Sequence, residues 1–336
     1  MIPTPHDLAR AYALTRQMTV RTPLLDAPAL AVASRAARVW VKAESLQKAG
    51  SFKIRGATWR LAQLTEAERA RGVIAFSSGN FAQGLAAAGR AAGVPVTIVM
   101  PIDAPAMKAR ATEAFGARVV LSDHGARPRE EVAAALARQM AADEELVLLH
   151  PFDDPAIVAG QAGVALEALE QLDEMGAGAD LFACPTGGGG LVGGLALAVR
   201  HRHPQAQIFA VEPVGYNGMG ASLAQGAALR VASDRRTICD ALQATQPGTA
   251  PFAAAHSAGV LGISVTDAQV RAALRLAFES LKLVLEPSGA VAIAALLAGH
   301  LPAEGREVLL IASGGNIGLD DFCALTGTAQ EGPGTQ

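Results

Sequence analysis

The amino-acid sequence predicts an α/β protein with two lobes and with open, mostly parallel sheets flanked by helices. From Val39 almost to the end of the chain, short runs of β-branched residues alternate with alanine-rich segments of helical periodicity. This alternation is the pattern of repeated strand–helix–strand units. Glycine is abundant, with 35 residues, whereas aromatic residues make up only 4% of the chain. That composition favours tight turns in packed α/β layers over an all-β sandwich.

Eight short segments are predicted to be strands because they are rich in branched apolar residues and lie between turn-forming residues. They are residues 39–42, 73–76, 96–100, 118–121, 146–150, 180–183, 208–211 and 307–312. Longer segments of helical periodicity lie between them, such as residues 80–92, 156–174 and 267–281. Residues 225–262 lose this periodicity and are rich in glycine, proline, serine and threonine, so we expect a long irregular segment there.

The two lobes are expected because a chain of 336 residues exceeds what a single hydrophobic core needs. Four compact strand–helix units between residues 72 and 152 predict a small inserted domain. Residues 1–71 and 153–336 together predict the large domain.

Charge and composition narrow the possible partners. The net charge is −3 and the chain has no basic run, which argues against nucleic acid or an anionic membrane surface as a partner. The longest uncharged apolar stretch, residues 289–299, is too short to span a bilayer, and residues 1–10 lack the pattern of a signal peptide. Three cysteines without CxxC spacing indicate neither a disulfide framework nor a zinc site. We therefore expect a cytoplasmic protein that acts on a small molecule.

Lys53 is the first candidate for chemistry. It is one of only five lysines and stands between Phe52 and Ile54 in the motif Gly-Ser-Phe-Lys-Ile-Arg-Gly. An amine among apolar side chains has a lowered pKa and, once neutral, attacks aldehydes. From this motif alone, a surface lysine on an amphipathic helix is an equally good interpretation.

Thr186 and four consecutive glycines, Gly187–Gly190, follow the predicted strand 180–183 and precede a helix. Backbone amides that converge at a helix N-terminus bind anions, so this turn predicts a phosphate site. The same segment contains the dinucleotide-binding pattern Gly188-x-Gly190-x-x-Gly193, and Glu212 ends a later strand. An NAD-dependent dehydrogenase is therefore an alternative at this point, although one such pattern is weak evidence.

Two further polar motifs follow predicted strands. Ser77-Ser78-Gly79-Asn80-Phe81 comes after strand 73–76 and begins a helix. Its small hydroxyls and free amides suit a substrate carboxylate. Ser313-Gly314-Gly315-Asn316 comes after strand 307–312, at the carboxyl end, where open α/β sheets bind their ligands.

In their order and separation, the four motifs resemble those of the fold-type-II enzymes that use pyridoxal 5'-phosphate (PLP), specifically the serine/threonine dehydratase (threonine ammonia-lyase) and serine racemase family. The resemblance covers about residues 22–318 and disfavours the dehydrogenase. It implies a PLP-dependent lyase, a homodimer, that eliminates water and ammonia from a β-hydroxy amino acid such as L-threonine or L-serine and leaves a 2-oxo acid. A serine or amino acid racemase on the same scaffold is the alternative.

The resemblance also implies roles for individual residues. Lys53 carries the Schiff base, and Ser78 stands on the opposite face of the cofactor as a second catalytic group. The glycines of the phosphate turn hold the cofactor phosphate together with Thr186, and Ser313 pairs with the pyridine nitrogen. The other implied cofactor-binding residues are Phe52, Asn80, Glu286 and Gly314. The implied substrate-binding residues are Ser77, Ser78, Gly79, Asn80 and Phe81.

This chain departs from the family pattern at two positions. Relatives commonly have histidine after the Ser-Ser-Gly-Asn motif, and Phe81 in its place predicts a larger or more apolar side-chain pocket. An aryl amino acid such as phenylserine is therefore among the expected substrates. Some relatives bind Mg²⁺ or Ca²⁺ through a glutamate and an aspartate six residues later. Here Glu212 is followed by Gly218, so no metal is expected.

Overall fold

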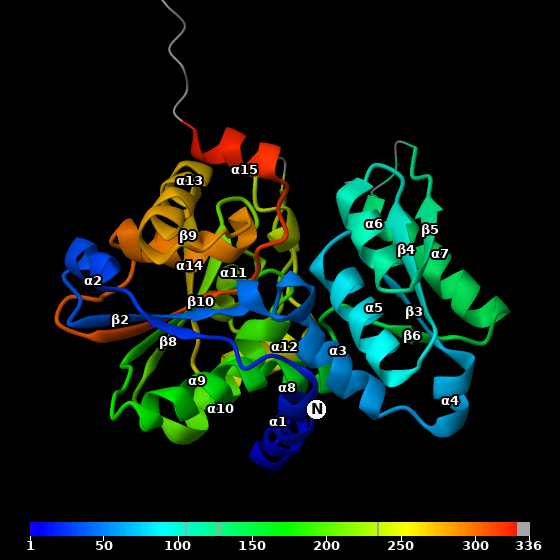
Figure 1. Cartoon of the computed structure of the whole chain (residues 1–336), viewed down its shortest axis with the longest axis horizontal. Coiled ribbons are helices and arrows are strands. Elements are labelled where there is room, and N and C mark those ends of the chain that lie inside the picture. Colours follow the sequence, from blue (N-terminus) through cyan, green and yellow to red (C-terminus); the bar gives the residue numbers. More distant parts are fainter. Residues whose placement is uncertain (105, 126, 128, 234, 328–336) are drawn as a thin grey trace, which may run out of the picture.

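The computed structural model describes residues 1–327 except 105, 126, 128 and 234. In this part of the chain, two separate sheets form two lobes that lie side by side (Figure 1). The strands of the first sheet are β1 (Leu24–Asp26), β2 (Arg38–Ala43), β10 (Glu307–Ala312), β7 (Leu181–Pro185), β8 (Gln207–Pro213) and β9 (Leu261–Val265), in this order. The strands of the second are β5 (Arg118–Ser122), β4 (Val96–Pro101), β3 (Val73–Phe76) and β6 (Val147–Leu149).

Every neighbouring pair of strands is parallel except β1 and β2. The predicted α/β fold with open, mostly parallel sheets is therefore confirmed. Strands β3 to β6 fall inside the range 72–152 that the sequence assigned to an inserted domain. The division of the chain into two domains at these boundaries stays a prediction.

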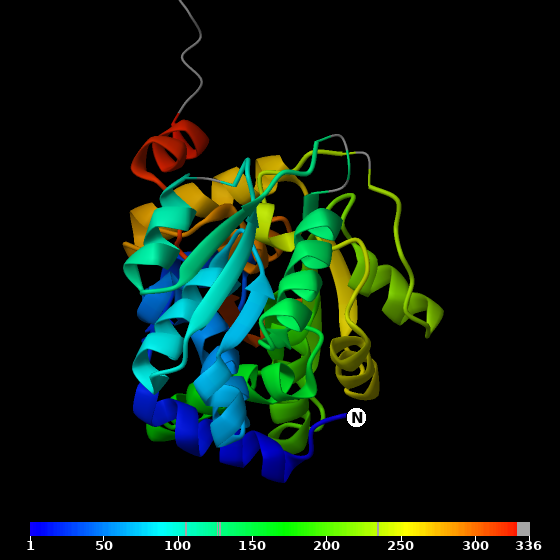
Figure 2. The same ribbon diagram turned by 90° about the vertical axis from the view of Figure 1, so that its right-hand side faces the viewer.

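Helices cover both faces of both sheets, as Figure 1 and the view of the small lobe in Figure 2 show. In chain order they are α1 (Pro5–Met18), α2 (Pro28–Ser34), α3 (Lys53–Ala62), α4 (Glu66–Arg71), α5 (Asn80–Ala92), α6 (Ala106–Ala114), α7 (Arg129–Asp143), α8 (Pro155–Gln161), α9 (Gly163–Glu174), α10 (Gly190–Arg202), α11 (Gly218–Gln225), α12 (Thr249–Ser257), α13 (Asp267–Leu276), α14 (Pro287–Leu297) and α15 (Leu319–Thr326). Shorter turns are η1 (Glu44–Leu46), η2 (Lys48–Gly50), η3 (Asp240–Leu242) and η4 (Ala277–Leu281). None of the helices in the described residues is long and apolar enough to cross a membrane.

All eight predicted strands are present, within one or two residues at their ends. Strands β1 and β9 were missed, and β9 together with α12 corrects the prediction that residues 225–262 are irregular throughout. Strand β9 lies at the edge of its sheet and is largely exposed, while α12 contains Pro251 in its first turn. Neither segment therefore has the apolar periodicity of a buried element. The helix predicted at 156–174 is divided at Ala162.

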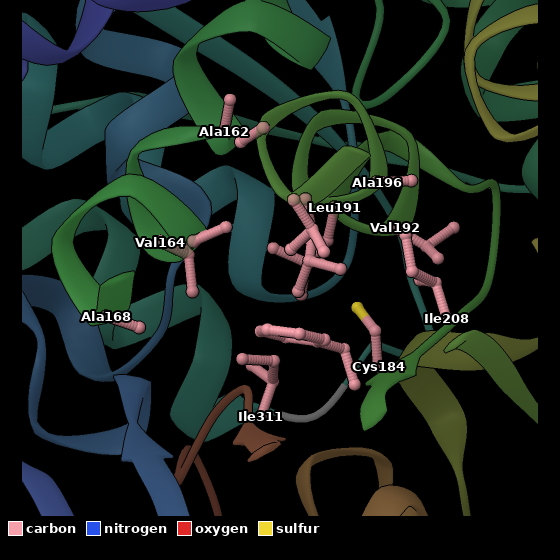
Figure 3. Packing of buried hydrophobic residues seen from close by; sticks show 14 of the residues in the cluster. Ala162, Val164, Ala168, Cys184, Leu191, Val192, Ala196, Ile208 and Ile311 are labelled. Atoms are coloured by element: carbon pink, nitrogen blue, oxygen red, sulfur yellow. The ribbon is translucent and has the colours of Figure 1, made fainter. Parts of the chain in front are cut away.

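The central strands are apolar on both faces because each face of the larger sheet packs on its own core. In β10, Leu309 and Ile311 belong to one core and Leu310 to the other. Figure 3 shows part of the first core, where side chains of α8–α9, α10 and the central strands meet. The labelled residues are Ala162, Val164, Ala168, Cys184, Leu191, Val192, Ala196, Ile208 and Ile311. This packing fixes α10, and therefore the glycine turn at its start, against the sheet.

A buried group of four charged side chains fixes α3 to the larger sheet. Arg55 of α3 contacts Glu44 at 2.7 Å and Glu167 of α9 at 2.8 Å, and Lys42 of β2 contacts Glu167 at 2.7 Å. All four side chains are almost inaccessible to solvent, and the two positive and two negative charges balance. Burial alone would raise the pKa of Glu167, but the charges of Arg55 and Lys42 lower it below its usual value.

Removal of one charge from this group should destabilise the protein strongly. We expect Glu167→Gln to lower the free energy of unfolding by about 3–5 kcal/mol, because it leaves an unbalanced buried positive charge. Urea unfolding followed by tryptophan fluorescence measures the loss. The matched control is Glu144→Gln, which breaks the exposed pair with Arg118 and should cost about 1 kcal/mol or less. Equal losses in the two variants would contradict this account.

Candidate active site

The four sequence motifs meet at the carboxyl ends of strands from both sheets. Asn80, which follows β3, donates to the carboxylate of Glu286 at the start of α14. Asn316, which follows β10, donates to Asn80 Oδ1 at 2.8 Å and to Ala49 O at 2.9 Å. One hydrogen-bonded chain therefore joins the lysine loop, the Ser-Ser-Gly-Asn motif and the last motif. This is the edge where open α/β sheets bind ligands.

The lysine loop is held on the end of β10 by backbone hydrogen bonds. Phe52 N donates to Ser313 O at 3.2 Å, and Gly315 N donates to Gly50 O at 2.9 Å. Gly314 lies between these bonds, where a Cβ atom would overlap with the Glu286 carboxylate. Only glycine fits there, so the motif allows the loop, the strand end and the carboxylate to approach one another.

Lys53 is the first residue of α3, and its amine lies among apolar groups. Nζ is 5.2 Å from the centroid of the Phe52 ring and 5.9 Å from that of Phe81. It donates one hydrogen bond, to Pro151 O at 3.3 Å. Burial lowers the pKa of Lys53 to about 8, against a smaller opposing effect of Glu286. The amine can therefore lose its proton near neutral pH, and these surroundings favour the reactive lysine over the surface lysine that the motif alone left open.

Glu286 is a buried carboxylate whose charge acts on this amine, with only 1% of its surface exposed. Oε1 accepts from Asn80, whereas Oε2 has no hydrogen-bond partner among the described residues. Burial raises the pKa of Glu286 to about 7, while Lys108, the Asn80 bond and Lys53 lower it. A buried carboxylate oxygen without a partner is a candidate contact for a polar ligand group.

The glycines Gly187–Gly190, here called the tetraglycine turn, connect β7 to α10. Gly189 has a φ of +94°, which favours glycine. A Cβ atom at Gly188 would overlap with the ring of Phe152. Since the turn has no side chains, the amides at the N-terminus of α10 can reach an anion. Thr186 Oγ1 donates to Cys184 O at 3.1 Å, so its hydroxyl hydrogen would have to turn to reach a phosphate.

Glu212 has a structural role, which removes the main support for the alternative of an NAD-dependent dehydrogenase. It is fully buried, and its two carboxylate oxygens accept from Met219 N and Gly220 N, each at 2.8 Å. Burial raises its pKa to about 8, against the effect of these two bonds. A carboxylate engaged in this way cannot bind a ribose. The described residues contain no group of three or more histidine, cysteine or acidic side chains that could hold a metal ion.

The remaining predicted site residues have different surroundings. Ser77, Ser78 and Gly79 are partly exposed in the loop after β3, where Gly79 N donates to Ser77 Oγ at 3.2 Å. Phe81 is 2% exposed and belongs to the core of the small lobe. It shields the Lys53 amine and adds no open apolar surface. The roles assigned to these residues and to Ser313, which is buried at the end of β10, stay predictions.

The sequence analysis missed two groups of this site and gave no role to a third, Asn316, which it named only as part of the last motif. Asn316 carries the hydrogen-bonded chain, Lys108 of α6 pairs across the two lobes with Asp240 of η3, and the segment 150–153 contacts both Lys53 and the tetraglycine turn. That segment begins at the last residue of the predicted strand 146–150 and follows β6, which ends at Leu149. The rule that ligands bind at carboxyl ends of strands would have identified it.

Comparison with known proteins agrees with this geometry. The model of the family described as pyridoxal-phosphate dependent enzyme matches residues 15–314. The L-threo-3-hydroxyaspartate ammonia-lyase of Saccharomyces cerevisiae is 34% identical over 99% of this chain and 99% of its own length. The L-threonine ammonia-lyase of Thermotoga maritima is 35% identical over 94% of this chain and 76% of its own length. The structure of maize serine racemase has a TM-score of 0.89 and 31% identity, and the match covers 96% of this chain and 97% of that protein.

The lowered pKa of Lys53 predicts how its reactivity depends on pH. In the ligand-free protein, the rate at which Lys53 is modified by an aldehyde with cyanoborohydride should rise by about tenfold per pH unit below pH 8 and level off above it, as the neutral fraction of the amine does. Peptide mapping by mass spectrometry measures this rate. A rate that keeps rising to pH 10, as for an ordinary exposed lysine, would contradict the lowered pKa.

Proposed function

Because this chain belongs to the family of pyridoxal-phosphate dependent enzymes, we propose that Lys53 holds the cofactor and that the residues around it direct the reaction. The chain is a PLP-dependent ammonia-lyase that acts on a β-hydroxy amino acid. One observation supports this placement of the cofactor. The Lys53 amine, whose pKa is lowered, lies at the same strand ends as the tetraglycine turn, which has no side chains and can bind an anion.

The residues present fit the cofactor. The amides at the start of α10 would hold the phosphate, and Lys53 would bind the aldehyde carbon. Asn80, Glu286 and Ser313 provide polar groups between these two ends. When bound, PLP supplies an aldehyde for the amine and a ring that withdraws electrons from the substrate Cα.

Proton transfer at the substrate would depend on Lys53. An amine with a pKa near 8 is both a competent base and a competent acid close to neutral pH. We assign Ser78 to the opposite side of the substrate, on the basis of the family resemblance of its motif. Ser313 offers a neutral hydroxyl to the ring nitrogen, which leaves the ring less electron-withdrawing than a carboxylate partner would. That favours prompt loss of the β-hydroxyl.

We propose a small substrate, such as L-serine, L-threonine or 3-hydroxyaspartate, in preference to phenylserine. Phe81 suggested an apolar pocket, but its side chain fills the core of the small lobe and leaves little surface for an aryl ring. The names of the similar proteins support hydroxyaspartate and threonine, and a racemase remains the second candidate because serine racemases are also similar.

A substrate panel with chiral analysis tests this proposal. We expect 2-oxo acid from at least one of the three small amino acids with a kcat/KM at least about tenfold above that for phenylserine, a difference of roughly 1.4 kcal/mol. Lys53→Ala is the control and should form no product. Failure of the PLP-loaded protein to form 2-oxo acid from any of them would contradict the lyase. Faster formation of the D-isomer than of the 2-oxo acid would favour the racemase.

We also propose that the protein is a homodimer located in the cytoplasm. Three large apolar side chains on α15, η4 and the following segment are exposed: Leu319 by 75%, Phe278 by 49% and Val284 by 45%. Phe278 packs on Phe322, the side chain one turn after Leu319, and apolar patches of this kind support subunit contact. We expect light scattering at micromolar concentration to give about twice the chain mass of 34.3 kDa. The mass of a single chain would contradict the dimer.

A further inference from the structure

A turn that the sequence motifs did not include lies against the Lys53 amine. It follows β6 and consists of His150, Pro151, Phe152 and Asp153, which we call the His150 turn. Pro151 O accepts the hydrogen bond of Lys53 Nζ at 3.3 Å. Phe152 packs so closely on the tetraglycine turn that a Cβ atom at Gly188 would overlap with its ring. The His150 turn therefore contacts both groups proposed to hold PLP.

The imidazole of His150 closes this turn. Its Nδ1 atom accepts from Asp153 N at 2.9 Å and from Phe152 N at 3.4 Å. Because Nδ1 must offer its lone pair to these amides, the ring proton of the neutral imidazole lies on Nε2. The ring is also held between two aromatic side chains, with centroid distances of 5.5 Å to Phe76 and 4.6 Å to Phe152 and near-perpendicular planes. The orientation of the imidazole is therefore fixed on three sides.

The next residues anchor the turn to the large lobe. Asp153 Oδ1 accepts from Ala250 N at 2.9 Å, at the start of α12. Asp154 caps α8 through Ala156 N at 2.7 Å and pairs with Arg60 of α3, also at 2.7 Å. The turn and Asp154 thus link the last strand of the small sheet to three helices, α12, α8 and α3. The position of the Pro151 carbonyl depends on the bonds that close the turn.

We propose that His150 is a positioning residue, whose neutral imidazole closes the turn that holds the Pro151 carbonyl where it orients the Lys53 amine. This inference rests on the proposed role of Lys53 and deepens it. His150 acts through the backbone of the turn and contacts neither the substrate nor the cofactor in this role.

Protonation of His150 should open the turn. A protonated Nδ1 is a donor and cannot accept from the two amides. Four charged groups surround the ring: Asp153 and Asp154 in and beside the turn, Lys53 on α3 and Arg138 on α7. Burial lowers the pKa of His150 from its ordinary value of 6.5, the two aspartates raise it, and Lys53 and Arg138 lower it. Because the pKa of His150 is lowered in the folded protein, the imidazole is still neutral and the turn still closed at pH 6.5. The turn is lost only when the pH falls below this lowered pKa.

Two substitutions at this position separate positioning from simple packing. Asparagine can still accept from backbone amides two and three residues on, as in an Asx turn, but it does not titrate near pH 6. Phenylalanine retains an aromatic ring but cannot accept a hydrogen bond from these amides.

We expect His150→Phe to lower kcat by about 10- to 100-fold, as misplacement of a reacting group does, with KM changed less than about threefold. His150→Asn should restore most of the loss and remove the fall in kcat that protonation of His150 causes at acidic pH. His256→Asn, at an exposed histidine of α12, is the matched control.

The ligand-free protein gives a test that does not depend on turnover. We expect the capture of PLP by His150→Phe to be slower than that of the wild type by a factor similar to the loss in kcat, with capture by His150→Asn close to the wild type. Nitrogen NMR of the ligand-free wild type should show His150 as the Nε2–H tautomer at pH 7. This measurement decides the matter even if His150→Phe fails to fold.

Three results would overturn the inference: an Nδ1–H tautomer in the wild type, equal impairment of both variants, or no effect of either variant. Failure of the wild type to bind PLP at all would instead contradict the proposed function. The NMR measurement distinguishes the two failures, because the tautomer is read in the absence of cofactor.

Discussion

Two backbone hydrogen bonds between the lysine loop and the end of β10 hold the site together. Phe52 N–Ser313 O and Gly315 N–Gly50 O join segments that are more than 260 residues apart in the chain, and Asn316 extends this contact to Asn80 across the gap between the lobes. The start of α3, which carries Lys53, is thereby placed at the carboxyl ends of strands from both sheets. The approach of Glu286 to the strand end and the need for glycine at position 314 follow from this contact.

Helix α3 carries two cations two residues apart, and their surroundings give them opposite properties. Arg55 is buried beside Glu44 and Glu167, so it remains charged and anchors the helix. Lys53 has a carbonyl and two aromatic rings around it, and the charge of Glu286 raises its pKa less than burial lowers it. The same loss of hydration is therefore compensated at one position and left uncompensated at the other. The ion pairs of Arg55 therefore stabilise the helix that positions the Lys53 amine.

Much of the fold and of the candidate site could be predicted from the sequence. The central strands are apolar on both faces, and glycine-rich motifs at the carboxyl ends of strands are found in only a few kinds of site. The edge strand β9 could not be predicted, because its exposure removes the apolar alternation, and helix α12 could not, because Pro251 in its first turn disguises the helical pattern. The burial of Phe81 and the capping of α11 by Glu212 depend on tertiary packing, which no local motif reports. The predicted roles of Ser78, Thr186 and Ser313 rest on the resemblance of their motifs.

The most direct test of the account is the site of covalent attachment. The protein is loaded with PLP, reduced with borohydride, digested and mapped by mass spectrometry, so that the modified lysine is identified among Lys42, Lys48, Lys53, Lys108 and Lys282. The account predicts one pyridoxyl group per chain, on Lys53, and loss of the visible absorption band on reduction. Modification at any of the other four lysines, or none at all, would contradict it.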